Sequence, residues 1–518
     1  MNKRLLKGAF ILTIAALFTK ILSVVYRIPY QNVTGDIGFY IYQQVYPIHG
    51  IVFTLMMYGF PVVIAKLAVE ERKNNSHVFA VSFFVLTAVC LTFFILLFLL
   101  SPVLANIAGD RELAPLYRTM SASILFVPFI SVLRGMFQAQ EYALPTALSQ
   151  ISEQLVRVVV IVALAIFFVR NGFSVYVVGA GAAAGSVAGA AFSMLVLIGF
   201  YLKYVQPVRF HFAIPWKTFI PIGKNVIVQG FFISIGALTF VLFQLIDSFT
   251  VITHLEQFGY SLQEAKRLKG IYDRSQPLLQ LGFTLATSLS LVIVPALAAN
   301  LSRNALHEVR NQAGFALKVT FIISIAASFG LAVIAEPANV MLFTDSHGSA
   351  VIRTIGFSIF FGSLALVSIA ILQGMNRVKD TLYIVLFGLV VKCMVNITFI
   401  PIYGIHAAAA GTVSGFFVMA VYSLIIMQRL LNMFKAYPFQ FFRIFFAIGV
   451  MTVTIWIWQM LFTRFEFTDA RFAAASLALS SVAIAVVVYG GLLHLFRIFT
   501  PVEIELLKRK REGVEREN

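Results

Sequence analysis

The stretch YIYQQVYPIHGIVFTL, residues 40–55, returns about 230 residues later as GIYDRSQPLLQLGFTL, residues 270–285. When 41–55 is set over 271–285, six of fifteen positions agree. The shared positions are Ile41/Ile271, Tyr42/Tyr272, Pro47/Pro277, Phe53/Phe283, Thr54/Thr284 and Leu55/Leu285. Because Pro and Tyr are among them, a chance match of apolar letters does not explain the agreement. The two stretches therefore predict an internal repeat.

Two further repeated sequence patterns occur in the same order along the chain. LRGM at residues 133–136 returns as LQGM at 372–375. Two glycine pairs share a spacing of seven residues: Gly172 with Gly179, and Gly404 with Gly411.

The composition places this repeat in a membrane. The 518 residues are 60% hydrophobic and 12% charged, whereas a soluble chain is about one quarter charged. Apolar stretches long enough to span a bilayer recur throughout, and in lipid such stretches form helices. We expect fourteen spans, at about 8–29, 43–69, 77–101, 113–139, 146–169, 175–202, 219–252, 273–300, 311–335, 351–373, 381–401, 405–428, 440–463 and 472–497.

The net charge of +17 raises the question of nucleic acid, but the basic residues stand singly or in small groups between spans. With the N-terminus inside, most of the 39 Lys and Arg fall in inner segments, which predicts that both termini are cytoplasmic. No nucleic acid partner is expected. The outer loop at about 254–272 is expected to form a short surface helix.

The repeated patterns fall in expected spans that are six spans apart along the chain. Because six is an even number, both copies have the same orientation in the membrane. The sequence therefore predicts an all-α polytopic protein with two parallel six-helix lobes around a central cavity. Two lobes that rock around a cavity are typical of a transporter. The expected parts are an N-terminal lobe at 1–210, a C-terminal lobe at 211–435, two added helices at 436–498 and a charged cytoplasmic tail at 499–518.

Ionisable side chains within spans are costly and each needs a reason. Arg27 stands near a helix end and could instead reach the headgroups. Glu153 and Arg157 are four residues apart and are expected to pair on one helix. Asp247 is expected to pair with Arg274 or Arg27. The glycine spacing in GAGAAAGSVAG, residues 179–189, predicts close helix packing.

The candidates fall into two groups. The substrate-binding candidates are Arg27, Arg274, Lys20, Gln43, Gln44 and His49. The coupling or ion-pair candidates are Asp247, Asp273, Glu153, Arg157 and Lys392. Cations outnumber acids in this set, and surplus cations in a cavity of low dielectric favour an anion. Arginine suits phosphate through its bidentate fork, so a lipid-linked sugar with a pyrophosphate bridge fits.

Several stretches together resemble one family. They are KGAFILTIAALFTKILSVVYRIPYQNVTGDIGFYIYQ, YGFPVVIAKLAVEE, LRGMFQAQEYALPTALSQISEQLVRV, GIYDRSQPLLQLGFTL and LQGMNRVKDTL. The chain resembles the multidrug/oligosaccharidyl-lipid/polysaccharide (MOP) exporter superfamily over essentially its whole length. It is most similar to the branch of polysaccharide-biosynthesis and stage V sporulation protein B-like proteins, which is related to the lipid II flippases.

The resemblance implies a flippase for an undecaprenyl-pyrophosphate-linked cell-wall, peptidoglycan or polysaccharide precursor in the bacterial cytoplasmic membrane. It also implies a cationic site on which Arg27 and Arg274 take the places of family arginines in helices 1 and 8, with Lys20 a looser match. Helix 2 departs from the family pattern, because Gln43, Gln44 and His49 stand where an arginine is expected. Lipid II itself is therefore in question, and a different glycolipid is an alternative.

Two other functions stay open. One is a cation-coupled exporter of drugs or small amphiphiles, although helix 1 lacks the acid that the drug-antiporter branch uses there. The other is a membrane glycosyltransferase or ligase, for which the outer loops offer only scattered acids. No enzyme activity, metal or cofactor is expected, and no nucleotide-binding motif is present. The expected partners are the polyprenyl-linked glycolipid, membrane lipids and proteins of cell-wall synthesis. H⁺, Na⁺ or the membrane potential would drive transport.

Overall fold

The structure, a computed structural model, is mostly helical in the residues that it describes and contains no strand there. It describes residues 3–71, 75–204, 215–287, 305–432, 440–462, 464–465 and 467–499. Twelve helical stretches in these ranges are long and apolar enough to cross a membrane, which confirms the all-α polytopic class. The expected first and second spans appear as one stretch, Ile11–Glu70, and the expected eighth span runs outside the described residues after Thr287.

The chain divides into two compact units. The first comprises Met1–Leu281 and Arg377–Gly415, and the second comprises Gly282–Asn376 and Phe416–Asn518. The lobe boundaries expected from the sequence stay a prediction, and the tail lies outside the described residues beyond residue 499.

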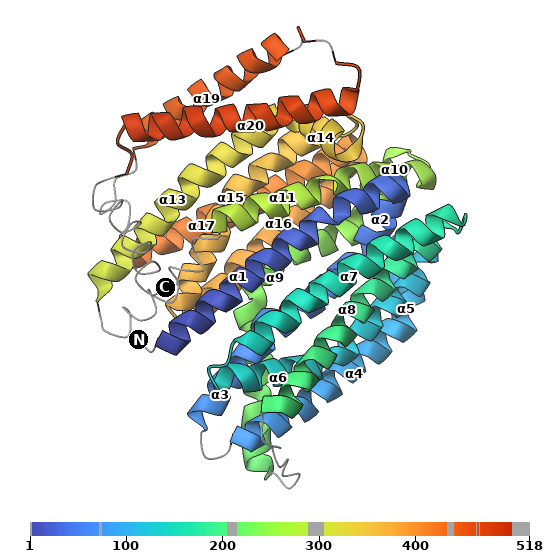
Figure 1. The fold of residues 1–518 in the computed structure, drawn as a ribbon, viewed down its shortest axis with the longest axis vertical. Helices are drawn as coiled ribbons and strands as arrows, with labels where there is room; N and C mark the ends of the chain where they lie inside the picture. The colour runs from blue at the N-terminus through green and yellow to red at the C-terminus, as the bar shows by residue number, and fades with distance from the viewer. Residues whose placement is uncertain are drawn as a thin grey trace. The chain divides into compact units, whose positions relative to one another are not determined.

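The first unit carries every element that matters for the site (Figure 1). Its helices are α1 (Lys3–Val25), α2 (Arg27–Thr54), the π-helical turn η1 (Leu55–Gly59), α3 (Phe60–Glu70), α4 (Asn75–Ile107), η2 (Arg111–Leu113), α5 (Ala114–Ser121), η3 (Ala122–Phe126), α6 (Val127–Ala139), α7 (Leu144–Arg170), α8 (Val175–Tyr204), α9 (Trp216–Phe258), α10 (Leu262–Asp273) and α16 (Val378–Tyr403). Helices α11 (Ser275–Thr287) and α17 (Ile405–Leu431) begin in this unit and end in the second.

The second unit contains α13 (Leu306–Val333), α14 (Ala335–Phe343), α15 (Ser349–Gly374), α19 (Phe441–Phe462) and α20 (Ala470–Leu495). Helix α13 packs on α15, and α19 packs on α20. The Tyr489 hydroxyl on α20 donates to the Ile322 carbonyl oxygen on α13 at 3.0 Å, which ties the C-terminal helix to this bundle.

Residues 30–42, which were expected to be an outer loop, are helical apart from one position. Gly35 has φ 69° and ψ −177°, a conformation that only glycine adopts readily, and it kinks α2 without ending it. After Thr54 the chain forms the π-helical turn η1 before α3 begins. The residues between the expected first and second spans are therefore helical on both sides of a kink at Gly35, and their place outside the membrane stays a prediction.

Helices α7 and α8 pack closely along their length (Figure 1). A Cβ at Gly189 would lie 2.7 Å from the Glu153 carbonyl oxygen, and one at Gly185 would lie 2.6 Å from Ile161. The prediction that the glycine stripe lets two helices approach is confirmed. The backbone that carries Glu153 and Arg157 is thus held directly against α8.

The Gly35→Ala variant should lose stability, because alanine cannot adopt the Gly35 conformation without strain. We expect the free energy of unfolding to fall by about 1–3 kcal/mol, measured by thermal unfolding of the purified protein in detergent. Gly199→Ala is the matched control, since a Cβ there meets nothing within 4 Å in an ordinary helix. An equal effect of both variants would contradict the strained role of Gly35.

Candidate functional site

Arg27 is the first residue of α2 and its side chain is fully buried, with 0% exposure. Its guanidinium carbon lies 4.2 Å from the centroid of the Tyr46 ring, a cation–π contact. None of its three guanidinium nitrogens has a hydrogen-bond partner among the described residues. The alternative that Arg27 reaches toward headgroups does not agree with this burial. A buried cation without an anion is costly, so Arg27 is poised for one.

Arg157 on α7 lies beside the same ring. Its guanidinium carbon is 5.5 Å from the Tyr46 centroid, and the side chain is 2% exposed. Its Nη2 donates to the hydroxyls of Tyr26 at 3.1 Å and Tyr42 at 2.9 Å, while Nη1 contacts Gln154 at 3.4 Å. All of these acceptors are neutral, so Arg157 keeps its charge uncompensated.

Tyrosines and one histidine complete this group, which we call the cationic cluster: Tyr26, Arg27, Tyr42, Tyr46, His49 and Arg157. The Tyr26 and Tyr42 hydroxyls lie 2.6 Å apart. His49 is 1% exposed, lies within electrostatic range of both arginines, and neither ring nitrogen has a partner in the described structure. Within the described residues no carboxylate pairs with either arginine, so the cluster presents two positive charges.

The expected pair between Glu153 and Arg157 is wrong. Glu153 instead accepts from Arg134 Nη2 on α6 at 2.8 Å. Arg134 also donates to Ser149 on α7, to Ser193 on α8 and to the Met56 carbonyl oxygen of η1. Arg134 was not among the candidates predicted from the sequence. Its position inside the predicted span 113–139 could have identified it, because a charged residue within a span needs a partner or a function.

Arg274 was expected beside Arg27 in the substrate site, but it makes a bidentate ion pair with Asp36. Its Nε and Nη2 donate to the two carboxylate oxygens at 2.8 Å each. Gln31 also donates to Asp36, at 2.9 Å. A Cβ at Gly270 would lie 2.1 Å from the Asp36 carbonyl oxygen, so α10 is packed directly onto α2. The charge of Arg274 is therefore already compensated.

Asp247 on α9 has a different partner from either expected arginine. Lys392 Nζ on α16 lies 2.9 Å from both of its carboxylate oxygens, and Tyr272 and Asn396 also donate to them, at 2.8 and 3.0 Å. Thr412 accepts from Lys392 at 2.6 Å. The prediction failed because the partner comes from a helix about 145 residues away in the sequence.

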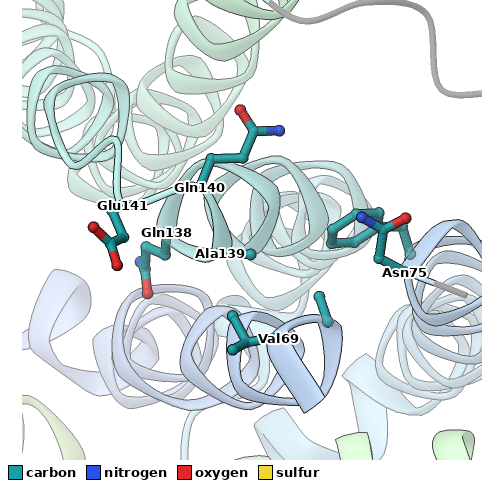
Figure 2. A pocket seen from close by; sticks show the side chains of 8 residues that line it. Val69, Asn75, Gln138, Ala139, Gln140 and Glu141 are labelled. Atoms are coloured by element: carbon teal, nitrogen blue, oxygen red, sulfur yellow. The ribbon is translucent and has the colours of Figure 1, made fainter. Parts of the chain in front are cut away.

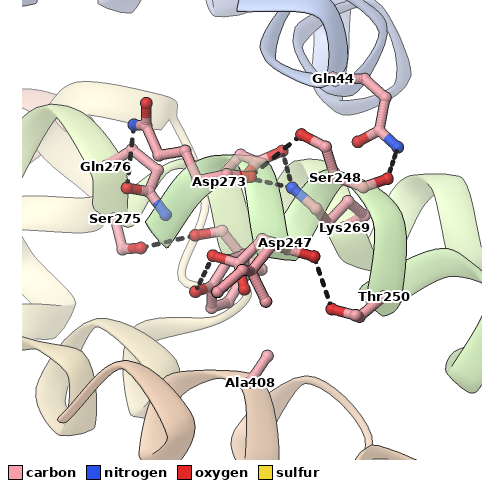
Figure 3. Close-up of polar contacts among 12 residues, drawn as sticks. Gln44, Asp247, Ser248, Thr250, Lys269, Asp273, Ser275, Gln276 and Ala408 are labelled. Carbon is pink, nitrogen blue, oxygen red and sulfur yellow. Dashed lines mark hydrogen bonds and ion pairs between the residues drawn. The ribbon is translucent and has the colours of Figure 1, made fainter. Parts of the chain in front are cut away.

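Helix α10 was expected to lie on the surface, but its basic side is buried. Lys269 contacts both oxygens of Asp273 at 2.6 and 2.7 Å (Figure 3). Lys266 lies 3.0 Å from Asp110 and donates to Tyr176 at 2.7 Å. The expectation of a short surface helix is confirmed, since Leu262–Glu264 and Arg267 are exposed, but the face that carries Lys266 and Lys269 is buried. The spacing of Lys266, Lys269 and Asp273 puts all three on one face of a helix, and this pattern could have indicated the buried face.

The remaining candidates are spread along α1 and α2. Lys20 is half-buried on α1. Gln43 and Gln44 are buried on α2, where Gln44 donates to the Ser248 carbonyl oxygen of α9. The side-chain oxygens of both glutamines lack a partner in the described part of the chain. Of the predicted substrate-binding residues, the contacts described above place only Arg27 and His49 in the cationic cluster.

A pocket of about 490 Å³ lies elsewhere in the first unit, at the ends of α3 and α6 (Figure 2). Its lining includes Val69, Asn75, Gln138 and Glu141. None of the predicted site residues is among the described residues that line it, and those lining residues carry no cationic side chain.

Comparison with known proteins agrees with this fold. The chain matches the family model of polysaccharide biosynthesis proteins at residues 5–301 and the MatE model at residues 271–398. It is 37% identical over 419 residues to the uncharacterized membrane protein YabM of Bacillus subtilis (strain 168), covering 80% of this chain and 78% of that protein. It is 23% identical over 455 residues to lipid II flippase MurJ of the same organism, covering 83% of each.

Solved structures share the fold at lower sequence identity. Lipid II flippase MurJ in an inward closed conformation gives a TM-score of 0.72 at 15% identity, covering 94% of this chain and 99% of that one. An inward-facing MATE family multidrug transporter gives 0.64 at 15% identity, with coverage of 81% and 96%.

These findings define a multi-pass membrane protein with the fold of the MOP superfamily. Within that superfamily, the chain belongs to the polysaccharide biosynthesis protein family.

Replacing Lys392 with Met should strongly destabilise the protein, because Asp247 would stay buried without its cation. We expect a loss of about 3–5 kcal/mol in the free energy of unfolding, measured in detergent. The double variant Asp247→Asn/Lys392→Met should lose less than Lys392→Met alone. Lys379→Met, at an exposed position of the same helix, is the control. Additive losses in the double variant would contradict a direct pair.

Proposed function

We propose that this protein is a flippase that moves a polyprenyl-diphosphate-linked cell-wall or polysaccharide precursor across the bacterial cytoplasmic membrane by alternating access. The observation that carries the proposal is the Arg27 guanidinium, which is fully buried and lacks any hydrogen-bond partner among the described residues. A phosphate oxygen is the acceptor that suits such a planar, charged donor best.

Two relatives support the choice of substrate class. MurJ of Bacillus subtilis is named a lipid II flippase, and the chain is also 27% identical over 435 residues to stage V sporulation protein B of that organism. The prenyl tail of such a substrate would stay in the bilayer while the charged head group crosses with the protein. The substrate need not be lipid II, because Gln43, Gln44 and His49 replace the arginine that the family resemblance implies in helix 2.

For the driving force we propose the membrane potential. Each candidate coupling acid, namely Asp247, Asp273 and Glu153, already holds a buried cation. The cationic cluster, in contrast, is positive when empty and close to neutral with a diphosphate bound. An inside-negative potential would therefore favour the return of the empty carrier, by about 2.3 kcal/mol per charge moved through 100 mV.

Rescue of a host depleted of its own lipid II flippase tests the function. The full chain should restore precursor exposure on the outer leaflet. Arg27→Gln should lower the rate about tenfold or more, because it removes charge-assisted hydrogen bonds. Arg118→Gln, which removes an exposed arginine, is the matched control. Membrane levels of each variant are measured in parallel.

If the well-inserted wild-type chain does not rescue, other polyprenyl glycolipids are tested in the same way, and failure with all of them contradicts the proposal. Rescue that survives Arg27→Gln would keep the function and reject Arg27.

The same assay separates two roles for Arg274. We expect Arg274→Ala to lower transport, because it leaves the partly buried Asp36 beside α10 without its cation. The double variant Asp36→Ala/Arg274→Ala should recover most of the loss if Arg274 acts through the ion pair. No recovery would instead support the direct substrate contact predicted from the sequence.

A second candidate is export of drugs or small amphiphiles, which the MatE match at residues 271–398 favours. Drug accumulation in cells with and without the chain tests it. Lower accumulation that depends on an ion gradient, together with no rescue of precursor exposure, would replace the flippase proposal.

A further inference from the structure

Arg27 and Arg157 come from different helices but contact the same ring. Their guanidinium carbons lie 4.2 and 5.5 Å from the Tyr46 centroid, and neither side chain is more than 2% exposed. Two buried like charges that contact one ring repel each other, and a single aromatic ring compensates them only weakly. An anion that contacts both would relieve the repulsion.

The two arginines differ in how they are held. Arg157 is fixed by the Tyr26 and Tyr42 hydroxyls and sits on the α7 backbone that Gly185 and Gly189 press against α8. Its Nε still lacks a partner in the described residues, as do all three nitrogens of Arg27. Arg157 is therefore held in place by its neighbours, whereas all three guanidinium nitrogens of Arg27 remain available to a ligand.

We propose that Arg27 and Arg157 together form a two-armed site for a diphosphate, with one phosphate on each guanidinium. This inference rests on the proposed function and assigns Arg157 a direct role in recognising the head group. A diphosphate that links two organic groups carries two negative charges, one per phosphate, and so matches the two cations. Its oxygens would displace the neutral tyrosine hydroxyls, because charge-assisted hydrogen bonds are stronger.

The cluster is closed to solvent in this structure, so a ligand reaches it only when the surrounding helices separate. The site is thus tested in the full-length protein in detergent, where both closed and open forms can be populated. The probes are inorganic pyrophosphate, inorganic phosphate, farnesyl diphosphate and farnesyl monophosphate, all at the same ionic strength. Binding is measured by calorimetry and by the shift in Tm.

For the wild-type protein, each diphosphate should bind about tenfold more tightly than the matching monophosphate. Arg27→Gln and Arg157→Gln should each remove this preference. Arg157→Lys keeps the charge but loses the bidentate guanidinium geometry, so it should bind diphosphate with intermediate affinity. This variant also keeps the test informative if Arg157→Gln does not fold. Arg118→Gln should bind like wild type, which excludes an effect of net charge alone.

Equal binding of diphosphate and monophosphate, or unchanged binding by a folded Arg157 variant, would overturn the two-armed site. Tighter binding of farnesyl diphosphate than of pyrophosphate supports a lipid-linked ligand, whereas equal affinities would contradict that source. The outcomes also separate site from function. Diphosphate binding without rescue of any precursor would reject the flippase, and rescue without a diphosphate preference would reject only the site.

Discussion

Glu153 accepts from Arg134, and this ion pair leaves Arg157 without a carboxylate one turn further along α7. Arg134 reaches Glu153 because α6, α7, α8 and η1 meet around its guanidinium, where two serine hydroxyls and a carbonyl oxygen fill its remaining donors. Arg157 then turns to the hydroxyls of Tyr26 and Tyr42. The positive charge of the cluster thus depends on a contact made by another arginine.

The buried cations in the described part of the first unit fall into two classes. Five of them have a carboxylate partner: Arg134, Lys266, Lys269, Arg274 and Lys392. Arg27 and Arg157 have none there. Buried ion pairs contribute little net stability, but they do fix which helices pack together. The paired cations therefore act as structure, and the uncompensated charge is concentrated at one place, around the Tyr46 ring.

The sequence predicted the class of fold well, because apolar length, repeated phrases and glycine spacing are local signals. It also identified most of the buried charges, since each stands out in an apolar span. Their pairing was not predictable in the same way. Glu153 and Arg157 have the spacing of a helical pair, yet a third helix supplies a better partner. Asp247 and Lys392 are far apart in sequence, and Lys266 and Lys269 look like loop residues until α10 packs onto α2.

The π-helical turn η1 has a consequence for how this chain can vary. A π-helical turn accommodates one extra residue within a helix, so side chains beyond it are rotated by about 100° relative to a continuous α-helix. Met56, whose carbonyl oxygen accepts from Arg134, lies within that turn. Loss of a single residue between Leu55 and Gly59 would convert the turn to regular helix and change which face of α3 meets α6. Substitutions in this segment should therefore disturb the structure less than a deletion, because only a deletion rotates the side chains of α3 relative to α6.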